Sequence, residues 1–133
     1  MANIKNFIYC LNVNSVDGRT DVVGILNTLT PEYIPGLFSF SVCFSLLDIT
    51  EGEHLLDLKF KDSDKNIIAG IDNAIITYKK DSNSNMPDEY MGVNVAAGLQ
   101  NVDLKKSGLY STEVVLDGKT VGEYYIFAKG KNE

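Results

Sequence analysis

The only histidine of the sequence closes a short acidic stretch, "DITEGEH" (48–54). Asp48, Glu51 and Glu53 supply carboxylates, and His54 supplies an imidazole nitrogen. Such groups within one loop could hold a divalent cation. A loop of solvated acids is the alternative interpretation. These four residues are the candidate cation ligands, and a single histidine excludes a multi-histidine zinc site.

A second acidic stretch, "DSDKN" (62–66), places oxygen-bearing side chains at alternate positions, as in the first half of an EF-hand loop. An EF-hand loop also needs a glycine at its sixth position and a glutamate at its twelfth. The sequence has Ile67 and Asn73 at those positions. We therefore predict a hairpin turn at this point and assign no metal site to it.

Residues for catalysis are sparse. A serine triad or a cysteine dyad would have to use His54, and no serine lies in a Gly-x-Ser-x-Gly elbow. Cys43 lies within a strand pattern, not at a helix N-terminus that would lower its pKa. The sequence has no glycine-rich phosphate loop of the Walker or dinucleotide type. Two carboxylates across a cleft would suffice for a glycosidase, but no pattern favours one. We expect no enzyme, no catalytic residue and no cofactor.

Charge and composition narrow the class of partner. The chain of 133 residues carries a formal net charge of −6. An acidic surface repels phosphate groups, so we expect neither nucleic acid nor a membrane as partner. The N-terminal stretch 1–13 lacks the continuous apolar core of a signal peptide. We therefore expect one cytoplasmic domain (1–133), with Cys10 and Cys43 as reduced thiols.

The segment "FSFSVCFSL" (38–46) shows the pattern that dominates the chain, which is an alternation with period two. In a strand, this alternation places Phe40 and Phe44 on a core face and collects small side chains on the other. Exposed strand positions usually carry long or charged side chains, so a bland strip could pack closely against another protein. Coverage by a loop of the same chain is the alternative. The candidate interaction strip consists of Ser39, Ser41, Cys43 and Ser45.

Further strand patterns recur along the chain and are separated by turn residues such as Asp17-Gly18. Together with the C-terminal hairpin they predict about eight strands and no helix. Because one face of each strand is apolar, the prediction is an all-β fold: a two-sheet antiparallel β-sandwich, Ig-like. The predicted strands before the hairpin are 4–13, 21–29, 38–46, 54–60, 66–79 and 90–102.

The C-terminal hairpin can be predicted in more detail. Asp117-Gly118 favours a two-residue type I′ turn, because both central residues of that turn need positive φ. Regular pairing from this turn would place Tyr110 opposite Tyr125 on one face, with Leu109 and Ile126 on the other. In residues 124–127 both faces are apolar, which predicts a central strand rather than an edge strand.

The order of these features resembles a family of small uncharacterised bacterial and phage proteins, classed as a domain of unknown function. The shared pattern is an Asp-Gly turn, a proline-containing link, an alternating strand, a turn with paired aspartates and a closing hairpin. The resemblance covers most of the chain and implies a fold, since the family has no established activity. The matching residues are Asp17, Gly18, Gly24, Pro31, Pro35, Asp62, Asp64, Gly108, Tyr110, Asp117 and Gly118.

These observations favour a non-catalytic protein that acts through protein–protein contacts. Its partner would be a foreign protein or a second copy, as in a homodimer. The resemblance suggests one version of this hypothesis, a phage- or mobile-element-encoded protein that acts on a host factor. The alternative is a β-sandwich that binds a small ligand or a divalent cation through the loop 48–54.

Overall fold

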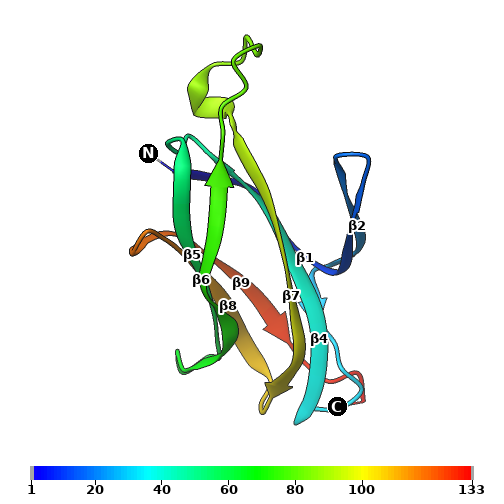
Figure 1. The fold of residues 1–133 in the computed structure, drawn as a ribbon. Helices are drawn as coiled ribbons and strands as arrows, with labels where there is room; N and C mark the ends of the chain where they lie inside the picture. Colours follow the sequence, from blue (N-terminus) through cyan, green and yellow to red (C-terminus); the bar gives the residue numbers. More distant parts are fainter. Residues whose placement is uncertain (1, 133) are drawn as a thin grey trace.

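The computed structural model describes residues 2–132, which form two packed β-sheets (Figure 1). Sheet A has the strand order β2-β1-β4-β7, and sheet B has the order β3-β9-β8-β5-β6. The predicted all-β sandwich is therefore confirmed. No helix in the described residues is long and apolar enough to cross a membrane. The elements are β1 (Asn3–Val16), β2 (Arg19–Leu26), β3 (Thr28–Leu29), β4 (Gly36–Leu47), β5 (Gly52–Lys61), β6 (Ile67–Tyr78), the 3₁₀ turn η1 (Asp88–Tyr90), β7 (Gly92–Leu104), β8 (Gly108–Leu116) and β9 (Lys119–Ala128).

The segment predicted as one strand at 21–29 is two strands that belong to different sheets. β2 pairs antiparallel with β1 in sheet A, whereas β3 pairs parallel with Phe127 and Ala128 of β9 in sheet B. Leu29 is completely buried by this crossing. Apolar residues recur through both strands, and no proline separates them, so the sequence pattern does not reveal the change of sheet.

The core lies between the inner faces of the two sheets. Phe40 and Phe44 of β4 are each 1% exposed, as their period-two spacing predicts. The ring of Phe40 packs edge-on against Phe60 of β5, with 5.1 Å between centroids. Phe60 in turn stacks on Tyr110 of β8 at 5.6 Å. Strands from both sheets thus share one aromatic core.

A buried hydroxyl group links the two sheets where β1 passes β9. Tyr9 donates its hydroxyl hydrogen to the carbonyl oxygen of Tyr124 at 2.8 Å. The hydroxyl of Thr112 lies 2.7 Å from the Tyr9 oxygen and must therefore donate to it. The ring of Phe7 stacks on that of Tyr124, with 4.2 Å between centroids. Burial raises the pKa of Tyr9 to about 12, so the phenol remains a neutral donor.

The C-terminal hairpin follows the predicted turn but not the predicted register. Asp117 and Gly118 have φ of 50° and 81°, as a type I′ turn requires. Val115 pairs with Thr120 but Val114 pairs with Gly122, so Val121 is an extra residue in β9. A bulge of one residue moves every later side chain of the strand to the opposite face.

The predicted Tyr110–Tyr125 pair is therefore wrong. Tyr110 pairs with Ile126 and is 1% exposed, whereas Tyr125 pairs with Ser111 and is 56% exposed. The sheet order places β9 between β3 and β8, so the prediction of a central strand holds at its C-terminal end and fails along the rest of its length. β8 lines one side of β9 along the strand, but β3 covers the other side only at Phe127 and Ala128.

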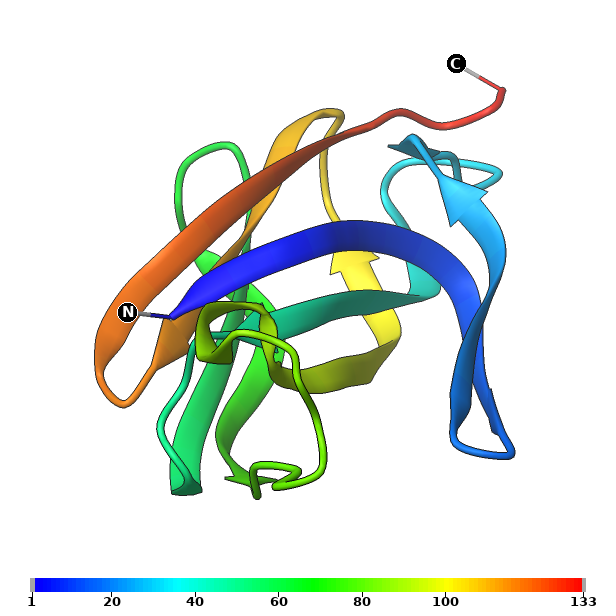
Figure 2. The same ribbon diagram turned by 90° about the horizontal axis from the view of Figure 1, so that it is seen from above.

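The hairpin of β1 and β2 extends beyond the sandwich as an arm, residues 11–26 (Figures 1 and 2). β1 pairs with β4 only as far as Cys10 opposite Ser41, and past that point its paired strand is β2. Gly24 has φ of +69° and lies beneath the side chain of Leu11. A Cβ atom there would come within 2.7 Å of Leu11 Cδ1, so the arm needs glycine at this position.

The link between the sheets gives a stability prediction. Tyr9→Phe removes the donor to Tyr124 and the acceptor of Thr112, which is fully buried. Leaving buried polar groups unpaired should lower the free energy of unfolding by about 1–3 kcal/mol in urea denaturation. Adding Thr112→Val removes the stranded hydroxyl and should restore part of that loss. Tyr125→Phe, at an exposed phenol, is the control and should change stability by less than about 0.5 kcal/mol. A double variant less stable than Tyr9→Phe would contradict this account.

Candidate functional site

The predicted interaction strip lies on β4, on the outer face of sheet A. Ser39 is exposed and Ser45 half-buried, but Ser41 and Cys43 are only 9% and 8% exposed. Two of the hydroxyls serve the sheet itself. Ser39 Oγ accepts the backbone N–H of Asn101 at 2.9 Å, and Ser45 Oγ lies 2.7 Å from Asn94 Oδ1. Two of the four residues of the strip, Ser39 and Ser45, are accessible to a partner. Its role as a contact surface stays a prediction.

Both cysteines are free thiols and both are buried. The thiol of Cys10 donates a weak hydrogen bond to the carbonyl oxygen of Ser41, with 3.7 Å between Sγ and the oxygen. Burial raises the pKa of Cys10 and of Cys43, which disfavours the thiolate at neutral pH. These thiols are packing residues of sheet A.

His54, from the predicted cation loop, is held by two hydrogen bonds to acceptors. Its Nδ1 lies 2.6 Å from Asp117 Oδ2, and its Nε2 lies 2.7 Å from the carbonyl oxygen of Thr50. Both nitrogens can donate only in the protonated imidazole, so this arrangement favours the positively charged form. The bond to Thr50 and the bond to Asp117 raise the pKa of His54, and the same ion pair lowers the pKa of Asp117.

Of the other predicted cation ligands, Asp48 lines the same hollow as His54, whereas Glu51 is engaged elsewhere. Glu51 Oε1 accepts the backbone N–H of Lys80 at 2.9 Å, which ties the loop to the segment after β6. Within residues 2–132, no three His, Cys, Asp or Glu side chains lie close enough to hold a metal ion. The second acidic stretch forms the predicted hairpin turn, with Asp62 Oδ1 accepting the N–H groups of Asp64 and Asn66.

A hollow of about 450 Å³ lies beside His54, between the loop after β4 and the start of β9. Its walls are partly apolar, and its charged groups include the His54–Asp117 pair and Lys119. A small-ligand function of this loop would use this hollow. The lining residues are Ala2, Asp48, Ile49, Thr50, His54, Leu116, Asp117, Lys119, Thr120 and Val121.

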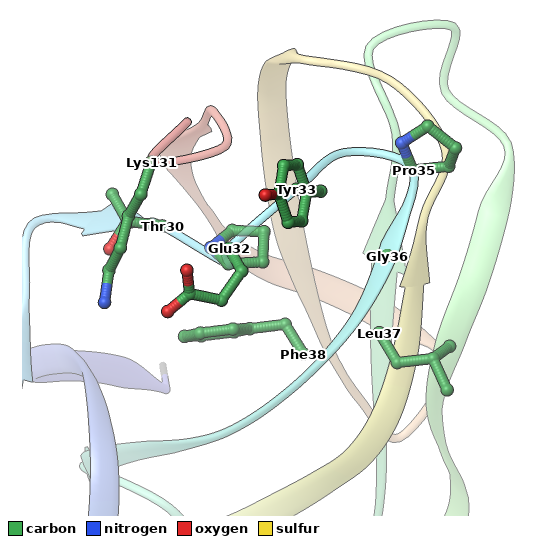
Figure 3. Close-up of a pocket in the computed structure, with 9 residues that line it drawn as sticks. Thr30, Glu32, Tyr33, Pro35, Gly36, Leu37, Phe38 and Lys131 are labelled. Atoms are coloured by element: carbon green, nitrogen blue, oxygen red, sulfur yellow. The ribbon is translucent and has the colours of Figure 1, made fainter. Parts of the chain in front are cut away.

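A second hollow of about 450 Å³ lies over the proline-containing link (Figure 3). The C-terminal segment extends the β3–β9 ladder and fixes the link, since Lys131 N–H donates to the Pro31 carbonyl at 2.8 Å. Glu32 and Lys131 place opposite charges beside the ring of Phe38 (Figure 3). These charges balance, and we assign no ligand to this hollow.

The outer face of sheet B carries a contiguous apolar patch, which we call the β8–β9 patch: Leu109, Tyr125 and Phe127. Their exposed fractions are 49%, 56% and 47%. Leu109 is directly opposite Phe127, and Tyr125 occupies the adjacent position on the same face of β9. The two-layer arrangement leaves this face open (Figure 2). The apolar run 124–127 was the sequence signal for this patch. The regular register expected for the hairpin instead placed Tyr125 opposite Tyr110.

A row of charges borders the β8–β9 patch. Lys59, Glu113 and Glu123 are directly opposite one another on β5, β8 and β9. Lys61 Nζ lies 2.6 Å from Glu113 Oε1, which raises the pKa of Lys61 and lowers the pKa of Glu113. Ser111 Oγ donates to Glu123 Oε2 at 2.9 Å. The apolar patch is therefore bordered by two lysines and two glutamates, and one of the glutamates, Glu123, is not in a direct ion pair within the described residues.

Comparison with known proteins gives a family without an assigned function. The sequence matches the family of unknown function DUF6941 over residues 5–129. The chain therefore belongs to this family, as the resemblance in its turns and strands predicted. No curated protein matches the sequence.

Three solved structures resemble this chain at low sequence identity, and the chain spans a small part of the first one. A glycosyl hydrolase family 2 member from Bacteroides cellulosilyticus DSM 14838 is 19% identical, with a TM-score of 0.50. The alignment covers 74% of this chain and 13% of the glycosyl hydrolase chain. The alkylpurine DNA glycosylase AlkC of Pseudomonas fluorescens is 9% identical, with a TM-score of 0.48 over 96% of this chain and 30% of its own. A putative lipoprotein from Bacillus anthracis is 12% identical, with a TM-score of 0.35 over 90% of this chain and 85% of its own. The first likeness concerns the fold alone.

The His54–Asp117 pair predicts a pH dependence of stability. The ion pair lowers the pKa of Asp117. Its contribution to the stability of the fold is therefore complete above pH 3.8 and is lost as the pH falls through the lowered pKa. The pKa of His54 is raised. Its contribution to the stability of the fold is therefore complete below pH 6.5 and is lost as the pH rises through the raised pKa. Neutral imidazole cannot donate from both nitrogens, so one acceptor then loses its bond.

We expect His54→Gln to lower the free energy of unfolding more at pH 5.5 than at pH 8.5, as measured by urea denaturation. NMR titration of His54 should give a pKa above 6.5. Asp117→Asn should reduce the difference between the two pH values without abolishing it, because the bond from His54 to the Thr50 carbonyl remains. An equal loss at both pH values would show that His54 acts through packing and not through its charge.

Proposed function

We propose that this protein is a non-catalytic binding protein that docks another protein on the outer face of sheet B. The observation that carries the proposal is the β8–β9 patch, in which Leu109, Tyr125 and Phe127 are contiguous and about half exposed. A soluble sheet with one open face usually carries polar residues there. Contiguous exposed apolar surface is typical of interaction sites, and aromatic residues are enriched in their centres.

The shape of the patch favours a protein over a small ligand. Its three side chains stand on a regular sheet face, and the hollows beside His54 and over the proline-containing link do not include them. A flat apolar surface buries little of a small molecule but can bury a large part of a protein partner. The net charge of −6 weighs against nucleic acid.

Two kinds of protein partner fit this proposal. A second copy of the chain would make a homodimer through the same face. A foreign partner fits the version in which the protein is encoded by a phage or mobile element and acts on a host factor in the cytoplasm. A different class of function, small-ligand binding, is favoured by the hollow beside His54 and would not involve the β8–β9 patch.

Arginine substitutions test the proposal. Tyr125→Arg and Phe127→Arg each place a charge in the β8–β9 patch, on side chains that do not enter the core. We expect each to weaken association at least about tenfold, which is about 1.4 kcal/mol of binding free energy. The melting temperature should shift by only a few degrees, about 1 kcal/mol for a domain of this size. Light scattering over a concentration series measures self-association, and quantitative co-purification from host extract measures a foreign partner.

Ile25→Arg is the matched control, because Ile25 is 64% exposed on the arm of sheet A. It should leave association unchanged. Loss of association with Ile25→Arg but not with Tyr125→Arg would place the contact on the arm and overturn the proposal. Melting temperatures should be compared at low protein concentration, because loss of a dimer lowers apparent stability by mass action.

A further inference from the structure

Two carboxylates of sheet B are placed directly opposite each other beside the β8–β9 patch. Glu113 on β8 pairs in register with Glu123 on β9. Like charges at directly opposed positions on one face of a sheet destabilise it. Glu123 is half-buried, so water screens its charge less than it would at a fully exposed site.

The two carboxylates differ in how they are neutralised. Glu113 has Lys61 at 2.6 Å and also accepts the hydroxyl hydrogen of Thr120. Glu123 accepts a hydrogen bond from the neutral hydroxyl of Ser111. Among residues 2–132, no lysine, arginine or histidine nitrogen lies within 4.0 Å of Glu123. Lys61, which pairs with Glu113, also acts on Glu123 at longer range. Glu123 therefore shares one lysine with Glu113 and has, among these residues, no ion-pair partner of its own at the border of the apolar patch.

We propose that the partner docked on sheet B presents an arginine or lysine to Glu123, next to an apolar or aromatic side chain that covers Tyr125. This inference rests on the proposed function and names the chemistry of its partner. A charged hydrogen bond would give Glu123 an ion-pair partner of its own, beside the lysine that it shares with Glu113, and would relieve the repulsion between the two carboxylates. The net charge of −6 also attracts a basic partner and repels a second copy of this acidic chain.

The strand geometry gives the spacing of this partner motif. Glu123 and Tyr125 are two residues apart on one face of β9, so their side chains leave the sheet about 7 Å apart. An extended partner segment has the same repeat. The motif that fits is an apolar or aromatic residue, any residue, and then a basic residue, in either direction of the segment.

Peptide display provides the test. Random dodecapeptides are selected on the full chain, after depletion on Tyr125→Arg to remove binders of other surfaces. We expect the selected peptides to share an apolar residue two positions from an arginine or lysine. A synthetic peptide of the consensus, and its analogue with citrulline in place of arginine, are then titrated by fluorescence anisotropy.

We expect Glu123→Gln to weaken binding of the arginine peptide about tenfold and to leave binding of the citrulline analogue unchanged. The glutamine can still accept the Ser111 hydrogen bond, so the fold should be retained. Glu89→Gln removes the same formal charge at an exposed position of η1 and is the control. It should change the affinity less than about twofold, because a distant exposed charge is screened by salt.

The outcomes separate this inference from the proposed function. Peptides that Tyr125→Arg weakens but Glu123→Gln does not would overturn the basic partner and leave docking on sheet B in place. Selection that yields no peptide sensitive to Tyr125→Arg would contradict both. A concentration-dependent dimer that dissociates in Tyr125→Arg would identify a second copy as the occupant and also overturn the inference.

Discussion

The bulge in β9 is the constraint on which both faces of sheet B depend. Val121 is the extra residue, and it turns Tyr124 and Ile126 inward and Tyr125 and Phe127 outward. Gly122 follows directly, and a Cβ atom there would lie 2.8 Å from the ring of Tyr124. The sequence "TVGEYY" (120–125) thus supplies the extra residue and the space that it requires.

The side chains of β9 that the bulge turns inward help to hold the two sheets together. Because Tyr124 faces the core, its ring stacks on Phe7 and its carbonyl receives the hydroxyl of Tyr9. These contacts join the edge of sheet B to β1 of sheet A. Within the described residues, no buried side-chain nitrogen or oxygen lacks a hydrogen-bond partner. The outward half creates the β8–β9 patch, so one backbone irregularity connects stability with the proposed binding surface.

Some of the residues that suggested chemistry make hydrogen bonds that hold loops in place, among them His54, Glu51 and Asp62. His54 of β5 connects the Thr50 carbonyl, in the loop after β4, to Asp117 of the last hairpin turn. Asp117 Oδ1 also accepts the backbone N–H of Leu55 at 2.8 Å. Asp62 closes a turn. A carboxylate or imidazole held by fixed backbone partners stabilises a loop and has fewer lone pairs left for a ligand. The surface residues Glu123 and Tyr125 are held by fewer hydrogen-bond partners of this kind.

The sequence by itself determined the local features of this protein. Period-two alternation located the strands and the inward side chains Phe40 and Phe44, and the two Asp-Gly pairs located the tight hairpins. Each of these signals acts between neighbours in the chain, so it can be read without knowing the partner strands. The apolar run 124–127 likewise showed that both faces of β9 are suited to burial.

Tertiary structure decided what depends on residues far apart in the chain. It placed β3 in the opposite sheet from β2, set the register of β9, and left the outer face of that strand uncovered. It also brought His54 to Asp117 and Glu113 opposite Glu123. These outcomes follow from which strands pair and in which register, and alternation is equally compatible with several such pairings. A shift of one residue keeps the pattern but reverses the faces, so the fold alone fixed which side chains are available to a partner.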